Sequence, residues 1–142
     1  MTWLLAGLAG AGLVIAASFT AAFYRPDSTL ARLAPPELCG LDPDKPGCGT
    51  VILTPGARVF GLPNALLGVT YYLVVLGVTL LGFPGPVWPW LLVAAWFTVA
   101  FGAYLGYRLL RVERMSCPLC WTAHALNTVL AIALSVAARS PL

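Results

Sequence analysis

Residues 117–138 read CPLCWTAHALNTVLAIALSVAA, a stretch that contains no Asp, Glu, Lys or Arg. A hydrocarbon layer needs about 20 residues of helix to be crossed, so this stretch is long enough to span a membrane. It opens with Cys117 and Cys120 in a Cys-x-x-Cys spacing, which is typical of redox-active thiols. The stretch therefore predicts a membrane-spanning helix with a reactive pair at its start.

Working outward from this stretch, three more segments have the same length and apolar character. The expected membrane-spanning helices cover residues 2–23, 63–81, 89–110 and 117–138. The first segment is too long for a cleavable secretory signal and lacks its basic start. Small residues in two of the spans are predicted to let helix backbones approach closely. These residues are Gly7, Gly10, Gly12, Gly102 and Gly106.

The composition agrees with a membrane protein. Hydrophobic residues make up 60% of the chain, charged residues only 9%, and the mean hydropathy is +0.88. These values exclude an ordinary soluble domain and a disordered chain. A net charge of +3 without a basic cluster offers no surface for nucleic acid. We predict an all-α membrane protein in which residues 1–142 form a single domain, a bundle of four transmembrane helices.

Four crossings place residues 24–62 and 111–116 on one side of the membrane and both termini on the other. All four cysteines then share one face: Cys39, Cys48, Cys117 and Cys120. Seven of the eight basic residues lie on that same side, and only Arg139 lies on the other. Taken alone, the positive-inside rule predicts that the cysteine face is cytoplasmic.

The last span carries a polar stripe. Ser116 is a suitable N-cap, and a thiol at Cys117 would face the unpaired N–H groups and the positive end of the helix dipole, which favour a thiolate. Cys120, His124 and Asn127 follow Cys117 at steps of three, four and three, and so share one helix face. Polar groups inside a membrane are functional candidates by default, although His124 and Asn127 could also only hydrogen-bond within the bundle.

The second cysteine pair lies in the loop between the first two spans. Cys39 and Cys48 are separated by GLDPDKPG, whose prolines and glycines predict a turning strap that can close a disulfide and also swing. Residues 51–62 are apolar but interrupted, too short to span, and are expected to lie over the mouth of the bundle as a lid.

Each of these features has a simpler explanation. Cys39 and Cys48 could be a structural staple, and Asn64 could only begin a helix. A zinc site is the other alternative, but the spacing Cys-x8-Cys with Cys-x2-Cys departs from common ligand patterns, and we predict no metal. In combination, the two pairs above an intramembrane polar stripe describe a relay from water-soluble thiols to a lipid-soluble acceptor.

Three segments carry a resemblance to a known family. They are CGTVILT (residues 48–54), RVFGLPNALLG (58–68) and CPLCWTAHALN (117–127). In this order they resemble the vitamin K epoxide reductase family, including its bacterial and archaeal homologues. The resemblance runs from about Cys39 to Asn127 and implies a four-helix bundle around a quinone of the menaquinone, ubiquinone or vitamin K type.

The resemblance also implies roles for individual residues. A reduced thioredoxin-like protein would attack the Cys39–Cys48 disulfide, Cys48 would exchange with Cys117, and Cys120 would pass the electrons to the quinone. Four further residues match positions near the quinone in the family. They are Asn64 as a partner of a quinone carbonyl, Thr54 in the lid, Phe60 in the pocket wall, and His124 where vertebrate members have tyrosine.

Some features depart from parts of the family. We expect no thioredoxin-like domain fused after the last span, so the redox partner is a separate chain. The departures weaken the expectation of an epoxide substrate more than that of quinone reduction. Most members face an oxidising compartment outside the cytoplasm, whereas the charge pattern here favours the cytoplasm. Inward-facing relatives occur in heat-loving archaea, whose cytosol tolerates disulfides.

The sequence thus predicts a membrane enzyme that oxidises protein thiols and reduces a quinone. One alternative is a non-catalytic membrane protein whose cysteines bind metal or staple a loop. Another is the bacterial four-helix disulfide oxidase with its Cys-x-x-Cys in the first loop. In this chain the Cys-x-x-Cys opens the last span, which is the wrong order for that class.

Overall fold

The computed structural model of the protein describes residues 1–33, 48–82 and 85–139. Its long helices are α1 (Thr2–Tyr24), α3 (Asn64–Leu81), α4 (Trp88–Arg111) and α5 (Pro118–Arg139). All four are long and apolar enough to cross a membrane. The prediction of four spans is confirmed, and each helix end lies within one residue of its expected position, because hydropathy alone sets the length of a membrane helix.

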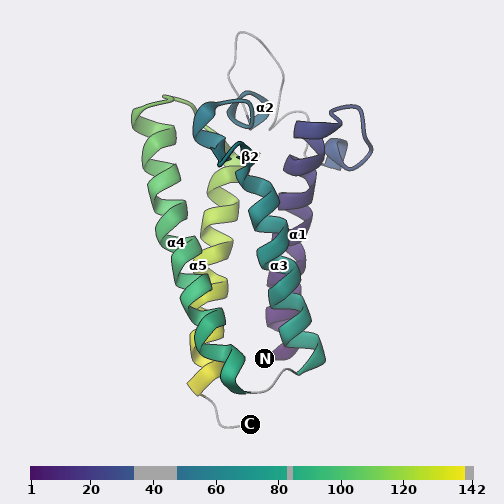
Figure 1. The fold of residues 1–142 in the computed structure, drawn as a ribbon, viewed down its shortest axis with the longest axis vertical. Coiled ribbons are helices and arrows are strands. Elements are labelled where there is room, and N and C mark those ends of the chain that lie inside the picture. Colours follow the sequence, from purple (N-terminus) through teal and green to yellow (C-terminus); the bar gives the residue numbers. More distant parts are fainter. Residues whose placement is uncertain (34–47, 83–84, 140–142) are drawn as a thin grey trace.

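The helices form two pairs, as Figure 1 shows. Helix α1 packs most extensively against α3, and α4 packs against α5, while contacts between α1 and α5 join the pairs. The start of α1 and the end of α5 lie at one end of the bundle, and the start of α5 lies at the other end, beneath the segment that follows residue 47. Cys117 and Cys120 therefore lie on the same side of the bundle as this segment.

The segment from residue 48 to residue 63 folds into four short elements over that end. They are α2 (Cys48–Val51), η2 (Pro55–Ala57), β1 (Arg58–Val59) and β2 (Leu62–Pro63). The strands pair antiparallel, with Arg58 opposite Pro63. The Arg58 guanidinium lies 5.1 Å from the centroid of the Phe23 ring at the end of α1. This cation–π contact holds the segment, hereafter the lid, against the bundle.

Most of the apolar core lies in the half of the bundle that contains the start of α1 and the end of α5. Its buried side chains come from all four long helices: Leu5, Ala9, Ala16, Tyr72, Val75, Val78, Leu91, Ala95, Leu130, Ala131 and Leu134. On α5, every buried residue comes after Asn127. The half of α5 that begins with the cysteines is therefore not used for this close-packed core.

The glycines behave differently from the prediction of close backbone packing. A Cβ atom on Gly7 or Gly10 would meet nothing within 4 Å, so the prediction is wrong for these two. A Cβ on Gly12, Gly102 or Gly106 would meet the ring of Tyr72, His124 or Trp121, respectively. These three glycines therefore make room for rings from neighbouring helices instead of for backbone. Which helix face meets a ring depends on the packing, which hydropathy does not reveal.

Two short 3₁₀ helices complete the described chain. Helix η1 (Ala31–Leu33) follows α1, and η3 (Gly85–Val87) precedes α4. The predicted strap between the loop cysteines, including Cys39, lies outside the described residues. Cys48 begins α2, but its side chain also lies outside what the structure describes.

Candidate active site

Cys117 and Cys120 form a disulfide at the start of α5. The Cys117 carbonyl accepts a hydrogen bond from the Trp121 N–H at 3.2 Å, and its Sγ accepts one from the Cys120 N–H, also at 3.2 Å. Cys117 is thus itself the N-cap residue. The prediction of Ser116 is wrong, because the helix begins at Pro118 and Ser116 is exposed one position too early. The N–H group and the helix dipole stabilise negative charge on the Cys117 sulfur when the disulfide opens.

The two sulfurs face different surroundings. Cys117 is 0% exposed and packs with Leu109 in a small apolar cluster that includes Val51. Val51 is the last residue of α2, which begins at Cys48. Cys120 is half-buried and lines a cavity between the helices. Val51 and Cys120 both pack against the cluster that contains Cys117, but of the two cysteines only Cys120 lines the cavity.

The cavity has a volume of about 320 Å³ and is lined by the four long helices and the lid. This volume lies within the range of about 300 to 1,000 Å³ that is usual for small-molecule sites. Most of its wall is apolar, as is also usual for such sites. The polar side chains among its lining residues are Thr54, Asn64, Tyr71, Tyr72, Thr98, Arg108, Glu113, Cys120, His124 and Asn127.

The stripe predicted on the last span faces this cavity. Cys120, His124 and Asn127 all line it, because steps of four and three bring them to one face of α5. Asn127 is engaged within the bundle, since its Oδ1 accepts a hydrogen bond from the Tyr72 hydroxyl at 2.6 Å. The His124 imidazole makes no hydrogen bond to any residue that the structure describes. His124 therefore keeps its hydrogen-bonding capacity for a ligand.

Two predicted ligand contacts from the lid region also line the cavity. Asn64 is the first residue of α3, directly after Pro63, and its amide forms no hydrogen bond within the described part of the chain. Thr54 lines the cavity from the lid, and its hydroxyl donates a hydrogen bond to the Val51 carbonyl at 2.8 Å. Asn64 is thus available to a ligand, whereas the Thr54 hydroxyl also holds the turn after α2.

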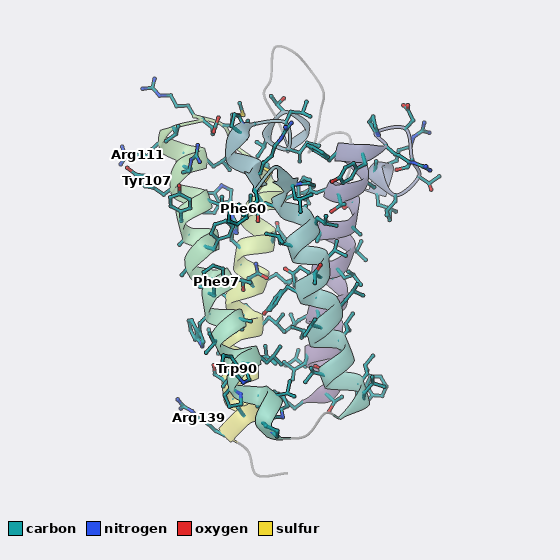
Figure 2. All side chains as sticks on the ribbon, viewed as in Figure 1. Phe60, Trp90, Phe97, Tyr107, Arg111 and Arg139 are labelled. Carbon is teal, nitrogen blue, oxygen red and sulfur yellow. A yellow bond between two sulfur atoms is a disulfide. The ribbon has the colours of Figure 1, made fainter. Side chains whose placement is uncertain are left out.

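The structure does not bring Phe60 to the cavity wall. Its side chain is fully exposed, and it is not among the residues that line the cavity (Figure 2). Phe60 and Gly61 form the two-residue turn between β1 and β2, and both have positive φ values, 50° and 81°. Such a turn is the usual connection of a tight hairpin and projects its side chains away from the strands. The prediction that Phe60 walls the pocket is therefore corrected.

Two tyrosines in the middle of α3 also line the cavity, although the sequence pattern did not predict a role for them. Tyr72 is buried and donates the hydrogen bond to Asn127. The Tyr71 hydroxyl is buried and forms no hydrogen bond of good geometry with the described residues, although Thr98 on α4 lies close enough to act on it. A phenol far from both ends of an apolar span is a detectable signal, because tyrosines in membrane helices usually lie at the interfaces.

A charged pair at the mouth of the cavity was also missed. Arg108 and Glu113 form an ion pair at 3.6 Å, and both line the cavity. A Cβ on Gly56 of the lid would lie 3.0 Å from Glu113 Oε1 and 3.3 Å from Arg108 Cζ. The lid therefore rests directly on this pair. Neither residue stood out in the sequence, because each is only one of several charges near the end of a span.

These observations define a class of protein. A disulfide at a membrane surface, with one sulfur on an apolar cavity between membrane helices, is the arrangement of a membrane redox protein that acts on a lipid-soluble ligand. Asn64, His124 and Tyr71 offer hydrogen bonds that no described partner uses with good geometry. The Tyr71 hydroxyl is buried, and a buried polar group calls for a partner. The site fits a flat apolar ring that carries carbonyl oxygens.

Comparison with known proteins agrees with this class. The profile of the vitamin K epoxide reductase family matches residues 3–135, and the chain belongs to this family. No curated protein and no solved structure matches the chain. Enzymes of this family are quinone-dependent disulfide oxidoreductases. The protein is therefore a multi-pass membrane enzyme that couples thiol–disulfide exchange to a quinone.

Proposed function

We propose that this enzyme oxidises a separate thioredoxin-like protein at the membrane surface and transfers the electrons to a quinone bound in the cavity. The observation that carries the proposal is the different placement of two bonded sulfurs. Cys117 is fully buried in the cluster against which Val51 of the lid packs, whereas Cys120 lines the cavity. A single disulfide therefore connects the side on which a protein thiol arrives to the side on which a lipid-soluble molecule is held.

The thiol steps run through both cysteine pairs. A partner dithiol reduces the Cys39–Cys48 disulfide and becomes a disulfide itself. The Cys48 thiolate then attacks the Cys117 sulfur, and the Cys120 thiolate leaves. Attack of Cys39 on Cys48 reforms the first disulfide and releases Cys117, whose negative charge is stabilised by the Cys120 N–H. The position of Val51 supports this order, because it lies three residues after Cys48 and packs against the cluster that contains Cys117.

The second half of the reaction takes place at the cavity. A bound quinone supplies the acceptor for two electrons and two protons, which Cys117 and Cys120 lose as they return to a disulfide. Asn64 and His124 orient the ring by hydrogen bonds to its carbonyl oxygens, and the apolar walls exclude water. The acceptor we propose is of the menaquinone, ubiquinone or vitamin K type.

The test compares two donors and two variants. Purified protein in detergent is given a quinone, or a quinone epoxide, with either a small dithiol or a reduced thioredoxin-like protein, and absorbance is followed. Cys120→Ser should reduce the rate to that without enzyme for both donors, because no disulfide can then form beside the quinone. Cys39→Ser should keep the activity with the small dithiol but lose it with the protein donor. Equal loss with both donors would contradict the relay order.

We also propose that the cysteine face is cytoplasmic. The basic residues of the described chain gather at the lid end, where Figure 2 shows Arg111, whereas Arg139 lies at the opposite end. Short basic segments are retained in the cytoplasm during insertion. In a chain whose own cysteines are replaced, Ser116→Cys should resist an impermeant thiol reagent in intact cells, and Gly85→Cys should react. The reverse pattern would place the lid outside.

A further inference from the structure

His124 is held closely by the helix opposite it. A Cβ on Gly102 of α4 would lie 2.7 Å from His124 Nδ1, and 3.3 and 3.4 Å from its Cε1 and Cγ. Real side chains essentially never approach closer than 3.0 Å in this way. On its other side, the imidazole meets the Trp121 ring edge-on, with centroids 6.2 Å apart. The absence of a side chain at Gly102 therefore creates the space in which the imidazole lies.

The contact between Gly102 and His124 also determines which imidazole nitrogen can meet a ligand. The three imidazole atoms nearest to Gly102 are Nδ1, Cε1 and Cγ, so Nε2 lies on the far edge of the ring. Nδ1 lies closest to the α4 backbone at Gly102, so Nε2 is the nitrogen on the side away from that backbone. A neutral imidazole with its proton on Nε2 presents that N–H to a ligand.

We propose that Gly102 is a positioning residue that holds the His124 ring so that Nε2–H points at a carbonyl oxygen of the bound quinone. The inference rests on the proposed function and adds to it a second residue, on another helix, that determines the geometry of the contact. Both Gly102 and His124 line the cavity. With the His124 ring in this place, a Cβ at position 102 would come within 2.7 Å of Nδ1 and force the ring to move.

The chain contains a matched control for this effect. Gly106 lies one turn further along α4 and accommodates Trp121, whose nearest atom would be 3.2 Å from a Cβ. That atom is the far end of a large ring, and neither Gly106 nor Trp121 lines the cavity. Gly106→Ala therefore makes the same chemical change between the same two helices, but its Cβ meets the far end of the indole ring and not the imidazole.

The first experiment is a double-mutant cycle on quinone reduction with a small dithiol as donor. Gly102→Ala should lower kcat/KM for the quinone about tenfold, the effect of losing one hydrogen bond, and Gly106→Ala less than about twofold. His124→Ala should also lower it about tenfold. Adding Gly102→Ala to His124→Ala should then change nothing further, because the ring that it displaces is absent. Additive losses would show that Gly102 acts through packing alone and would overturn the inference.

The second experiment does not depend on activity. His124 is the one histidine of the chain, so protein labelled with ¹⁵N-histidine and purified without a histidine tag gives a single imidazole spectrum. We expect a protonated Nε2 in the wild-type enzyme and in Gly106→Ala, a shift of that resonance when quinone is added, and a changed tautomer or resonance in Gly102→Ala. An unchanged His124 spectrum in Gly102→Ala would overturn this inference alone. An inactive wild-type enzyme would instead overturn the proposed function.

Discussion

The two halves of the bundle use the same four helices in opposite ways. Near the termini, Leu130 and Leu134 of α5 are completely buried in a close-packed core. Near the lid, His124 and Cys120 of the same helix line a cavity. One helix face thus changes from packing to ligand binding along its length. The close-packed half, which holds the helices together, is therefore separate from the lid half, which contains the cavity.

The boundary between these halves is a polar contact. Tyr72 of α3 donates its hydrogen bond to Asn127 of α5, and the Tyr72 ring occupies the space left by Gly12 of α1. Three helices therefore meet at one side chain. On the side of this contact toward the start of α1, the interior is filled mainly by apolar residues. On the side toward the lid, the cavity begins. The Tyr72 contact forms the floor of the candidate active site.

We expect the largest effect when a leucine is truncated in the close-packed half and in the cavity half and the losses of stability are compared. Leu130→Ala should lower the free energy of unfolding by about 2 to 5 kcal/mol, because it opens a void in a filled region. Leu105→Ala should cost much less, since Leu105 lines a space that is already hollow. Unfolding of both variants in mixed detergent micelles measures the difference. Equal losses would mean that the cavity half contributes as much to stability as the core.

The next prediction concerns the contact between Gly12 and Tyr72 at the floor of the cavity. A Cβ on Gly12 would overlap the buried Tyr72 ring, so Gly12→Ala should destabilise the protein by about 1 to 3 kcal/mol. Gly10→Ala, two residues earlier in the same helix, meets nothing within 4 Å and should leave stability unchanged. The thermal midpoints of the two variants provide the measurement. A stable Gly12→Ala variant would contradict the close approach of α1 and α3 at this level.

The smallest effect compares two adjacent hydroxyl groups. Tyr72→Phe removes the hydrogen bond to Asn127 and should cost about 0.6 kcal/mol, the average for such bonds between membrane helices. Tyr71→Phe removes a buried hydroxyl that lacks a hydrogen bond of good geometry, so stability should stay equal or rise. Detergent unfolding of the matched pair measures both. A greater loss of stability for Tyr71→Phe than for Tyr72→Phe would mean that Tyr71, and not Tyr72, makes the stabilising hydrogen bond.

Much of the fold could be predicted from hydropathy. The bilayer requires about 20 apolar residues from every crossing, and the four spans were located within one residue. The placement of Cys120, His124 and Asn127 on one face was equally predictable, because a helix repeats every 3.6 residues. The resemblance to the family rested on residues 48–68 and 117–127, and the family match covers them.

Other features could not be predicted, because they depend on which surfaces meet. The difference between Gly10 and Gly12 arises only because α3 presents Tyr72 to one of them. Phe60 was misplaced because a two-residue turn with positive φ directs it outward. Ser116 was assigned as the N-cap because serine favours that position, whereas α5 begins one residue later than expected, with Cys117 as its cap.

The membrane class, the number and ends of the long helices, and the polar face of the last one could be read from the amino-acid order, since these follow from hydropathy and helical period. The packing of the helices was needed to show that Cys117 is fully buried while Cys120 lines the cavity, and that Gly102 faces His124. The physical reason is that a helix dictates the direction of its own side chains, whereas their neighbours depend on how separate helices pack.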